Sequence, residues 1–385
     1  MSRPVLRTKL CDMLNIEYPI LSAGMGPSLA GENTGAPVEL VVAVSEAGGL
    51  GVLGASGFRV EEMRDAIREI KSLTDKPFGV DLLLPEAIVS QGGGMFIEGP
   101  LEVPLSELLK ALPKSHLDWI DKVKDELGLP DVDIMMKTDT TTAMPHEAIQ
   151  VCIEEKVPLF CSGLGNPGFM VKKAHESGMK VLGVVGNSKN AGRIAESGVD
   201  FVVAQGYEGG GHTGRVGTLA LMPQAIDAAS PVPVLAAGGI GDGRGIAASL
   251  AMGCIGVWVG TRFLASKEGG ILDVHKQRIL DSSDEGTRRS YLYTGKTSRA
   301  NYNRFHDLWE ESGLEPLPFP TQILFSSFLI ESFYQGGKKD YLGAFAGQVT
   351  GLIKEIKPAG KILEELVEET VDILNNKLPE SIITK

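Results

Sequence analysis

The sequence predicts an α/β protein built on a (β/α)₈ barrel, with an insertion after the third strand and a helical extension at the C-terminal end. Short apolar runs bounded by glycine or proline alternate with helical patterns of about 10 to 15 residues, which indicates βα units around a parallel sheet. The 385 residues accommodate one barrel of roughly 250 residues with large additions. Eight such runs favour a closed barrel over an open doubly wound sheet.

The first three βα units are regular. Their strands are expected at residues 19–22, 50–54 and 78–84, with helices near 38–47 and 60–73 between them. Each strand is a short apolar run of the kind that a sheet buried on both faces requires. These units establish the repeat against which the rest of the chain is compared.

The repeat breaks between residues 86 and 144 and then returns. The interrupting segment contains QGGGMF, several prolines, an amphipathic stretch near 115–127 and the polar run KTDTTT, so we expect an insertion. The remaining strands follow turns such as ESGMK and ESGVD, and they are expected at residues 158–162, 181–185, 201–205, 234–237 and 256–259.

The domain organisation follows from this pattern. We expect a barrel over residues 1–265 that includes the insertion at 86–144, and an extension over 266–385 that packs on the barrel. The run KILEELVEETVDILNNKL near the C-terminus predicts an amphipathic helix in that extension.

Composition and charge exclude several classes of protein. Subtracting 49 acidic from 37 basic residues gives a net charge of -12, which repels nucleic acids and anionic membranes. The four cysteines lie far apart without a C-x-x-C pair, so neither a zinc site nor a disulfide framework is expected. No signal-peptide or membrane-spanning pattern is present, so we expect a cytoplasmic protein, with a homodimer possible.

Three strand ends carry glycine-rich loops that suit a phosphorylated ligand with a planar ring. In a (β/α)₈ barrel the active site forms from the loops after the strands. Ala23, Gly24 and Met25 follow strand one, where small residues let a planar ring approach the backbone, although a plain tight turn explains them equally well.

Strands seven and eight end in a pair of loops typical of a barrel phosphate site. Gly238 and Gly239 follow strand seven ahead of a helix beginning near Asp242, and Gly260 and Thr261 follow strand eight. Glycine lets backbone N–H groups converge on an anion, the helix start adds free N–H donors, and Thr261 can donate its hydroxyl. The order and spacing of the pair predict phosphate binding.

The loop after strand six carries the candidate catalytic residue. It reads QGYEGGGHTG from Gln205 to Gly214 and places His212 at the barrel mouth after three glycines. Imidazole titrates near neutral pH, so His212 is the candidate general base or acid. Its alternative is an exposed loop histidine.

Other candidates are weaker. The remaining histidines lack partners at metal-ligand spacing and are interpreted as structural or surface residues, so no metal site is expected. Glu208 could orient a loop. TGKTS at residues 294–298 lacks the first glycine of a phosphate-binding P-loop and is expected near the active-site rim.

Several ordered motifs resemble those of the nitronate monooxygenase family, formerly called 2-nitropropane dioxygenases, over about residues 14–263. The most specific is AQGYEGGGHTG at 204–214, supported by PILSAGMG, PFGVDLLLP, VPVLAAGGIGDGRG and GVWVGTRF at strands one, three, seven and eight. The family is similar to the flavin-dependent enoyl-acyl-carrier-protein reductases.

The resemblance implies an FMN cofactor and a set of residues around it. Its phosphate would be held by Gly238, Gly239, Gly260 and Thr261. Its ring system would lie near a second group of residues: Ala23, Gly24, Met25, Gln205, Gly210 and Gly211. Asp81 stands where many relatives carry asparagine, which would put a carboxyl group beside the flavin.

The resemblance also implies a reaction. His212 would take the α-proton of a nitroalkane or handle the proton of a bound nitronate, and O₂ would convert the substrate into a carbonyl compound and nitrite. The implied partners are therefore a small-molecule substrate and O₂.

Two other functions stay open at this point. Asp81 and the insertion are compatible with an FMN-dependent NAD(P)H oxidoreductase that acts on a quinone or an enoyl thioester. The phosphate loops alone are also compatible with a barrel that binds a sugar phosphate without flavin, because a fold does not determine a reaction.

Overall fold

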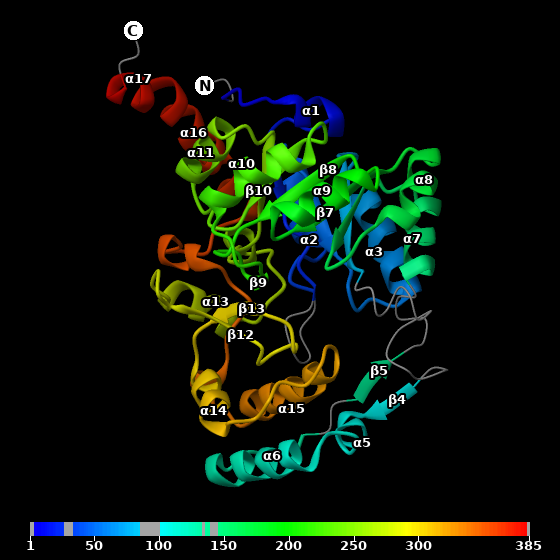
Figure 1. Ribbon diagram of the computed structural model, residues 1–385, viewed down its shortest axis with the longest axis vertical. Helices are drawn as coiled ribbons and strands as arrows, with labels where there is room; N and C mark the ends of the chain where they lie inside the picture. Colours follow the sequence, from blue (N-terminus) through cyan, green and yellow to red (C-terminus); the bar gives the residue numbers. More distant parts are fainter. Residues whose placement is uncertain (1–3, 27–33, 85–100, 133–134, 139–144, 383–385) are drawn as a thin grey trace.

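The computed structural model describes residues 4–26, 34–84, 101–132, 135–138 and 145–382. Eight parallel strands form one sheet in the order β1-β11-β10-β8-β7-β6-β3-β2, surrounded by helices (Figure 1). A parallel bridge between Leu21 and Leu50 joins the first and last strands, so the sheet closes into a barrel. The predicted (β/α)₈ fold is confirmed.

The eight barrel strands coincide with the predicted ones to within one or two residues. Their bounds are β1 Ile20–Ser22, β2 Gly51–Gly54, β3 Phe78–Leu83, β6 Leu159–Gly163, β7 Lys180–Val185, β8 Phe201–Gln205, β10 Val234–Ala237 and β11 Gly256–Val259. Nearly every residue in them is buried, as expected for a sheet covered on its outside by helices and filled inside by side chains.

The helices around the barrel bury one apolar face each, as α3 illustrates. In α3 (Val60–Leu73) the buried side chains Met63, Ala66, Ile67 and Ile70 recur at helical spacing and form one apolar face. The other helices that follow barrel strands are α2 Val38–Glu46, α7 Pro145–Glu154, α8 Gly168–Glu176, α9 Ser188–Glu196, α10 Thr218–Ala229, α11 Gly243–Ala251 and α12 Thr261–Leu264. The short α1 (Lys9–Leu14) lies at the opposite end of the barrel from the strand ends, where Thr8 donates to the carbonyl of Ile255 just ahead of β11.

The described residues of the insertion after β3 form two strands and two helices. The strands β4 (Leu101–Pro104) and β5 (Met135–Thr138) pair antiparallel, and α5 (Leu105–Leu109) and α6 (Lys114–Leu127) lie between them. The helix α6 matches the predicted amphipathic stretch. QGGGMF and most of KTDTTT lie outside the described residues.

The C-terminal part of the chain contains more than helices. Two strands, β12 (Thr287–Ser290) and β13 (Ser298–Asn301), pair with each other, and β13 also pairs with the two-residue strand β9 (Gly211–His212) in the loop after β8. These strands were not predicted, because the extension was expected to be helical. The helical elements are α13 Asp273–Asp281, α14 Arg304–Ser312, α15 Thr321–Gln335, η1 Lys339–Tyr341, η2 Gln348–Leu352, α16 Ala359–Asp372, η3 Ile373–Lys377 and α17 Leu378–Ser381.

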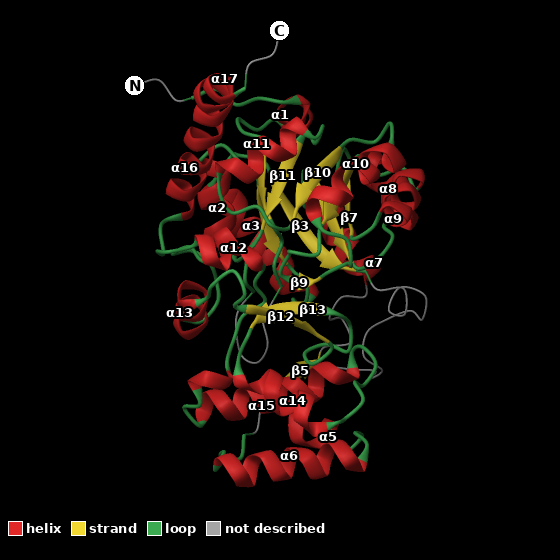
Figure 2. Ribbon diagram, turned by 60° about the vertical axis from the view of Figure 1, so that its left-hand side comes forward, coloured by secondary structure: helices red, strands yellow, loops and turns green. Residues whose placement is uncertain are grey.

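A second hydrophobic core lies beyond the carboxyl ends of the barrel strands. Side chains of α5 and α6 pack there against those of α14 and α15. Figure 2 shows these four helices together at the end of the molecule away from the two termini. The helix α16 instead packs on the outside of the barrel, where Leu363 and Leu366 join the main barrel core. The boundary between the barrel and the C-terminal extension, expected between residues 265 and 266, stays a prediction. Within the described ranges no helix is both long and apolar enough to span a membrane.

Candidate active site

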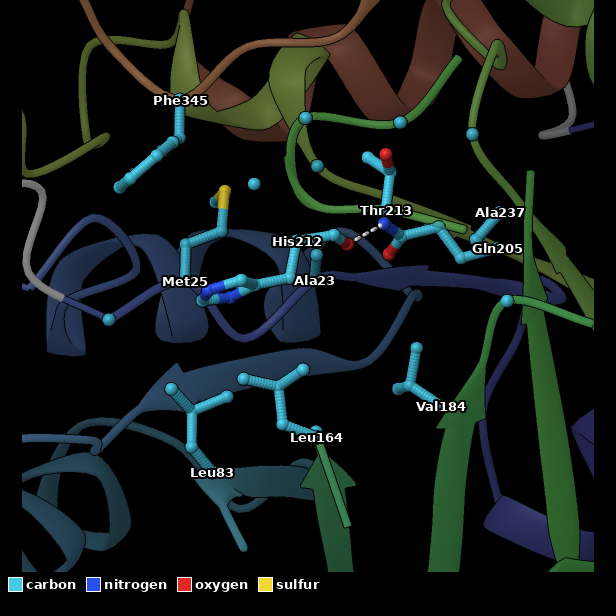
Figure 3. Close-up of a pocket in the computed structure, with 18 of the residues that line it drawn as sticks. Ala23, Met25, Leu83, Leu164, Val184, Gln205, His212, Thr213, Ala237 and Phe345 are labelled. Carbon is cyan, nitrogen blue, oxygen red and sulfur yellow. Dashed lines mark hydrogen bonds between the residues drawn. The ribbon is translucent and has the colours of Figure 1, made fainter. Parts of the chain in front are cut away.

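A cavity of about 1340 Å³ lies at the carboxyl ends of the barrel strands. Its floor comes from strand ends and the loops after them, and its roof from the C-terminal part of the chain (Figure 3). Every candidate site residue from the sequence lines this one cavity, namely Ala23, Gly24, Met25, Asp81, Gln205, Gly210, Gly211, His212, Gly238, Gly239, Gly260 and Thr261. The cavity has the size and place of a (β/α)₈ active site.

Strand pairing and two hydrogen bonds hold His212 in the cavity wall. His212 lies in β9 opposite Ser298 of β13. The side-chain amide of Gln205 donates to the His212 carbonyl at 2.8 Å, drawn as a dashed line in Figure 3. The Nε2 atom of His212 lies 2.9 Å from the hydroxyl of Thr294. The imidazole is therefore a fixed group and not a solvated loop side chain.

The protonation state of His212 follows from its surroundings. Burial, together with the nearby positive charge of Lys296, lowers the pKa of His212 from 6.5 to about 4. Desolvation and a like charge both disfavour imidazolium. The ring is therefore neutral at neutral pH and can accept a proton.

Asp81 is a buried carboxyl group on the same cavity. It lies on β3, is 9% exposed, and its Oδ1 has no hydrogen-bond partner in the described part of the chain. Burial raises the pKa of Asp81 from 3.8 to about 8. At neutral pH the carboxyl group is therefore mostly protonated, so it can donate a hydrogen bond to a bound ligand.

The loop after β1 presses directly against Asp81. A Cβ atom at Gly24 would lie 2.2 Å from the Cβ atom of Asp81, which is far below contact distance. Only glycine fits at this position, so a plain tight turn does not fully explain why glycine occurs here. Close packing against Asp81 requires the glycine.

The glycine pair after β10 has the backbone geometry of an anion-binding loop. Gly238 and Gly239 have φ angles of 86° and 75°, in the left-handed region that favours glycine. A Cβ atom at Gly238 would also lie 2.9 Å from the carbonyl oxygen of Gly206. Across the cavity wall, Thr261 accepts a hydrogen bond from the Gly347 amide at 2.9 Å, which leaves its own hydroxyl hydrogen available to a ligand.

One expectation about this loop is wrong. We expected the start of α11 to offer free N–H donors to a phosphate. The structure shows that the Asp242 side chain caps the helix and accepts from the amides of Arg244 and Gly245. The Gly243 amide donates to the Glu369 carboxylate at 2.8 Å. These amides are occupied by carboxylates from the chain itself, so an anion must depend on the glycine loops and on Thr261.

Several cavity residues were missed by sequence reasoning because they lie outside the repeated βα units. Thr294 and Lys296, within TGKTS, line the cavity beside His212, so that segment lies at the site as expected. Phe319, Ile323 and Phe345 supply apolar roof surface. Only the proximity of TGKTS had a sequence signal, and the roof residues had none.

Glu208, which could orient a loop, does so. Its carboxylate accepts hydrogen bonds from the amide and hydroxyl of Thr218 at the start of α10. It therefore fixes the glycine loop relative to that helix. In the described ranges no group of three or more His, Cys, Asp or Glu side chains is placed to hold a metal ion.

The fold and the site together define the class: a (β/α)₈ barrel oxidoreductase whose active-site cavity lies at the carboxyl ends of the strands. The model of the nitronate monooxygenase family matches residues 7–92 and 96–369. The chain belongs to the nitronate monooxygenase family, and membership implies a flavin cofactor.

Individual relatives agree with this assignment. A Mycobacterium tuberculosis protein named as a monooxygenase is 32% identical over 95% of this chain and 97% of its own length. A Staphylococcus saprophyticus protein named as a probable nitronate monooxygenase is 31% identical over 96% of this chain and 99% of its own length.

Two solved structures are similar to this chain over nearly its whole length. A nitroalkane oxidase from Streptomyces ansochromogenes has a TM-score of 0.75 at 28% identity and covers 94% of this chain and 98% of its own. FabK from Thermotoga maritima has a TM-score of 0.73 at 32% identity and covers 98% of this chain and 100% of its own.

Proposed function

We propose that this protein is an FMN-dependent nitronate monooxygenase in which His212 is the base. The observation that carries the proposal is the neutral His212 imidazole, held by Thr294 in the same cavity as two glycine loops suited to a phosphate. The substrates are alkyl nitronates, with nitroalkanes as a further possibility, and O₂. The products are a carbonyl compound and nitrite.

The residues around the cavity fit FMN. Gly238 and Gly239 adopt left-handed backbone conformations, so their amides can turn toward a phosphate that the Thr261 hydroxyl also reaches. The Oδ1 atom of Asp81, which has no partner in the described part of the chain, and the close packing at Gly24 suit a flat ring system with polar edges. When bound, the flavin supplies a redox centre between the organic substrate and oxygen.

The hydrogen bonds around Thr294 indicate which nitrogen of His212 is the base. The Thr294 hydroxyl has one hydrogen, which it donates to the Lys296 carbonyl at 3.1 Å. Its oxygen then accepts from Nε2–H of His212. Nδ1 is left without a hydrogen, so it can accept the α-proton of a nitroalkane.

The apolar walls support this chemistry by limiting water. Leu83, Leu164, Val184 and Phe345 surround the space next to the His212 ring (Figure 3). In a water-poor cavity the electrostatic interactions with a polar substrate group are stronger than in bulk solvent.

A substitution at His212 tests the proposal. The holoenzyme of the His212→Asn variant is expected to lose about 100- to 10,000-fold in kcat/KM for nitrite release from 2-nitropropane, whose α-proton must be removed, while its flavin absorption is retained. His175→Asn, on the exposed face of α8, is the matched control and keeps wild-type rates. A His212→Asn variant within threefold of the wild-type rate would rule out His212 as the base.

A second candidate is an FMN-dependent NAD(P)H oxidoreductase acting on a quinone or an enoyl thioester. The size of the cavity and the similarity to FabK favour it. Anaerobic mixing of the purified flavoprotein with NADH or NADPH separates the two functions. Rapid bleaching of the flavin by a nicotinamide identifies a reductase, whereas bleaching by a nitronate alone identifies a monooxygenase.

A further inference from the structure

Besides His212, four side chains of Asp, Glu, Lys or Arg line the cavity in the described part of the chain. Glu208 is bound to the start of α10, and Asp81 is buried and mostly protonated at neutral pH. Arg193 is exposed on α9 and faces solvent at the rim. Lys296 is half-buried, so it is the charge in the cavity wall that has no evident structural use.

The Lys296 ammonium lies over an aromatic ring and beside the proposed base. Its Nζ is 4.9 Å from the centroid of the Phe319 ring, and the His212 ring is 6.3 Å from the same centroid. Within the described ranges no carboxylate pairs with this lysine. By contrast, the other lysine that contacts an aromatic ring, Lys124, also forms an ion pair with Asp131.

An ammonium group in this position is under-compensated. A contact with the face of an aromatic ring is a weak attraction, and it replaces only part of the hydration that the cavity wall removes. An anion that enters the cavity restores the missing interaction. The charge of Lys296 also works against imidazolium formation at His212, and a bound anion opposes that effect.

We propose that Lys296 binds the planar oxyanion of the substrate beside His212 and selects anionic substrates over neutral ones. The oxyanion is a nitronate or a carboxylate, since both spread one negative charge over two oxygens. This inference rests on the proposed function for its substrate class. Lys296 would act as a specificity-determining residue, while His212 handles the proton.

Removing the charge tests this role without disturbing the local fold. The hydrogen bonds that Lys296 makes with Thr294 use backbone atoms, so Lys296→Met leaves them intact. Lys296→Arg keeps the charge and should rescue binding. Lys9→Met, on the exposed side of α1 at the other end of the barrel, removes an equal charge far from the cavity and is the matched control.

Three substrates separate the possible anions: nitroethane, which is neutral, ethyl nitronate, which has one charge, and propionate 3-nitronate, which also carries a carboxylate. A charge-assisted hydrogen bond is worth about 1.5–3 kcal/mol, so Lys296→Met should raise KM for its anion at least about tenfold. The KM for nitroethane and the kcat values should stay within about threefold. A rise for both nitronates assigns Lys296 to the nitronate group, and a rise for propionate 3-nitronate alone assigns it to the carboxylate.

A binding measurement distinguishes failure of this inference from failure of the proposed function. Propionate and nitrate are titrated into the holoenzymes and followed by the change in the flavin absorption spectrum. If the anions bind more weakly to Lys296→Met than to the wild type, and the wild type releases no nitrite, the anion site is supported and the monooxygenase function is rejected. Equal anion binding in all variants, or loss of flavin on Lys296→Met, would overturn the inference.

Discussion

Two ionisable side chains in the cavity wall, the buried Asp81 and the half-buried His212, are made neutral by the same physical cause. Desolvation raises the pKa of Asp81 to about 8 and lowers the pKa of His212 to about 4, because it disfavours whichever form is charged. At neutral pH the site therefore offers a carboxylic acid as hydrogen-bond donor and an imidazole as proton acceptor. Environment, and not residue type alone, separates a donor from an acceptor here.

The state of Asp81 predicts a pH dependence of stability. Its pKa is about 8 in the folded chain and near 3.8 when unfolded, so the folded state binds the extra proton between these values. Stability is therefore lost as pH rises from 5 to 8, by up to roughly 4 kcal/mol. Asp81→Asn should remove this loss, so its melting temperature exceeds that of the wild type by more at pH 8 than at pH 5.

Thermal unfolding of the flavin-free protein at both pH values checks this prediction. Asp65→Asn, at an exposed position on α3, is the control and should follow the wild-type pH profile. Parallel profiles for Asp81→Asn and wild type would show that Asp81 is ionised in the folded protein.

At the scale of elements, the C-terminal part of the chain holds the loop that carries His212 in place. The strand β13 pairs with β9, and the Gln348 amide donates to the Glu208 carbonyl at 2.9 Å. The neighbouring Gly347 amide donates to Thr261. The loop after β8 and the residue after β11 are thus tied to one segment, so His212 and the candidate phosphate site move together.

Neighbouring glycines in this loop predict different costs of adding a methyl group. A Cβ atom at Gly210 would lie 2.7 Å from the backbone carbonyl carbon of Ala346, whereas one at Gly211 would meet nothing within 4 Å. Gly211→Ala should cost about 1–2 kcal/mol for its left-handed backbone alone. Gly210→Ala should cost more and weaken FMN binding at least about tenfold, because backbone must move.

Melting temperatures and flavin dissociation constants of the two variants test this comparison. The Gly211→Ala variant serves as the control for adding a methyl group in the same loop. Equal effects of the two substitutions would mean that the Ala346 segment does not press on the loop.

For the whole molecule, the order of segments along the chain does not determine which hydrophobic core each segment joins. The inserted helices α5 and α6 share a core with α14 and α15, although about 170 residues or more separate them along the chain. The helix α16, close to the C-terminus, belongs to the barrel core and packs on α2 and α11. The chain therefore returns to the barrel after building the roof of the cavity.

This arrangement predicts that α16 contributes to the stability of the barrel. Leu363 is fully buried, so Leu363→Ala should cost about 2–5 kcal/mol of unfolding free energy through lost burial and a cavity. Denaturant unfolding measures the loss. Glu368→Ala, on the exposed side of the same helix, is the control and should change stability by less than about 0.5 kcal/mol. Similar losses for both variants would contradict a core role for α16.

The sequence by itself determined the barrel, its eight strands and the strand ends that carry the site. Buried apolar runs and glycine turns are local signals, and closure of a parallel barrel necessarily brings the loops after the strands to one end. Ala23, His212, Gly238 and Thr261 could therefore be assigned to one cavity from the sequence, and the family resemblance added Asp81.

The tertiary structure alone decided the rest. Thr294, Lys296 and Phe319 reach His212 from a part of the chain about 80 to 110 residues away, and no local pattern encodes such a contact. The capping of α11 by Glu369 likewise depends on where α16 packs. Protonation states also belong to this level, because burial is a property of the assembled molecule and not of the residue.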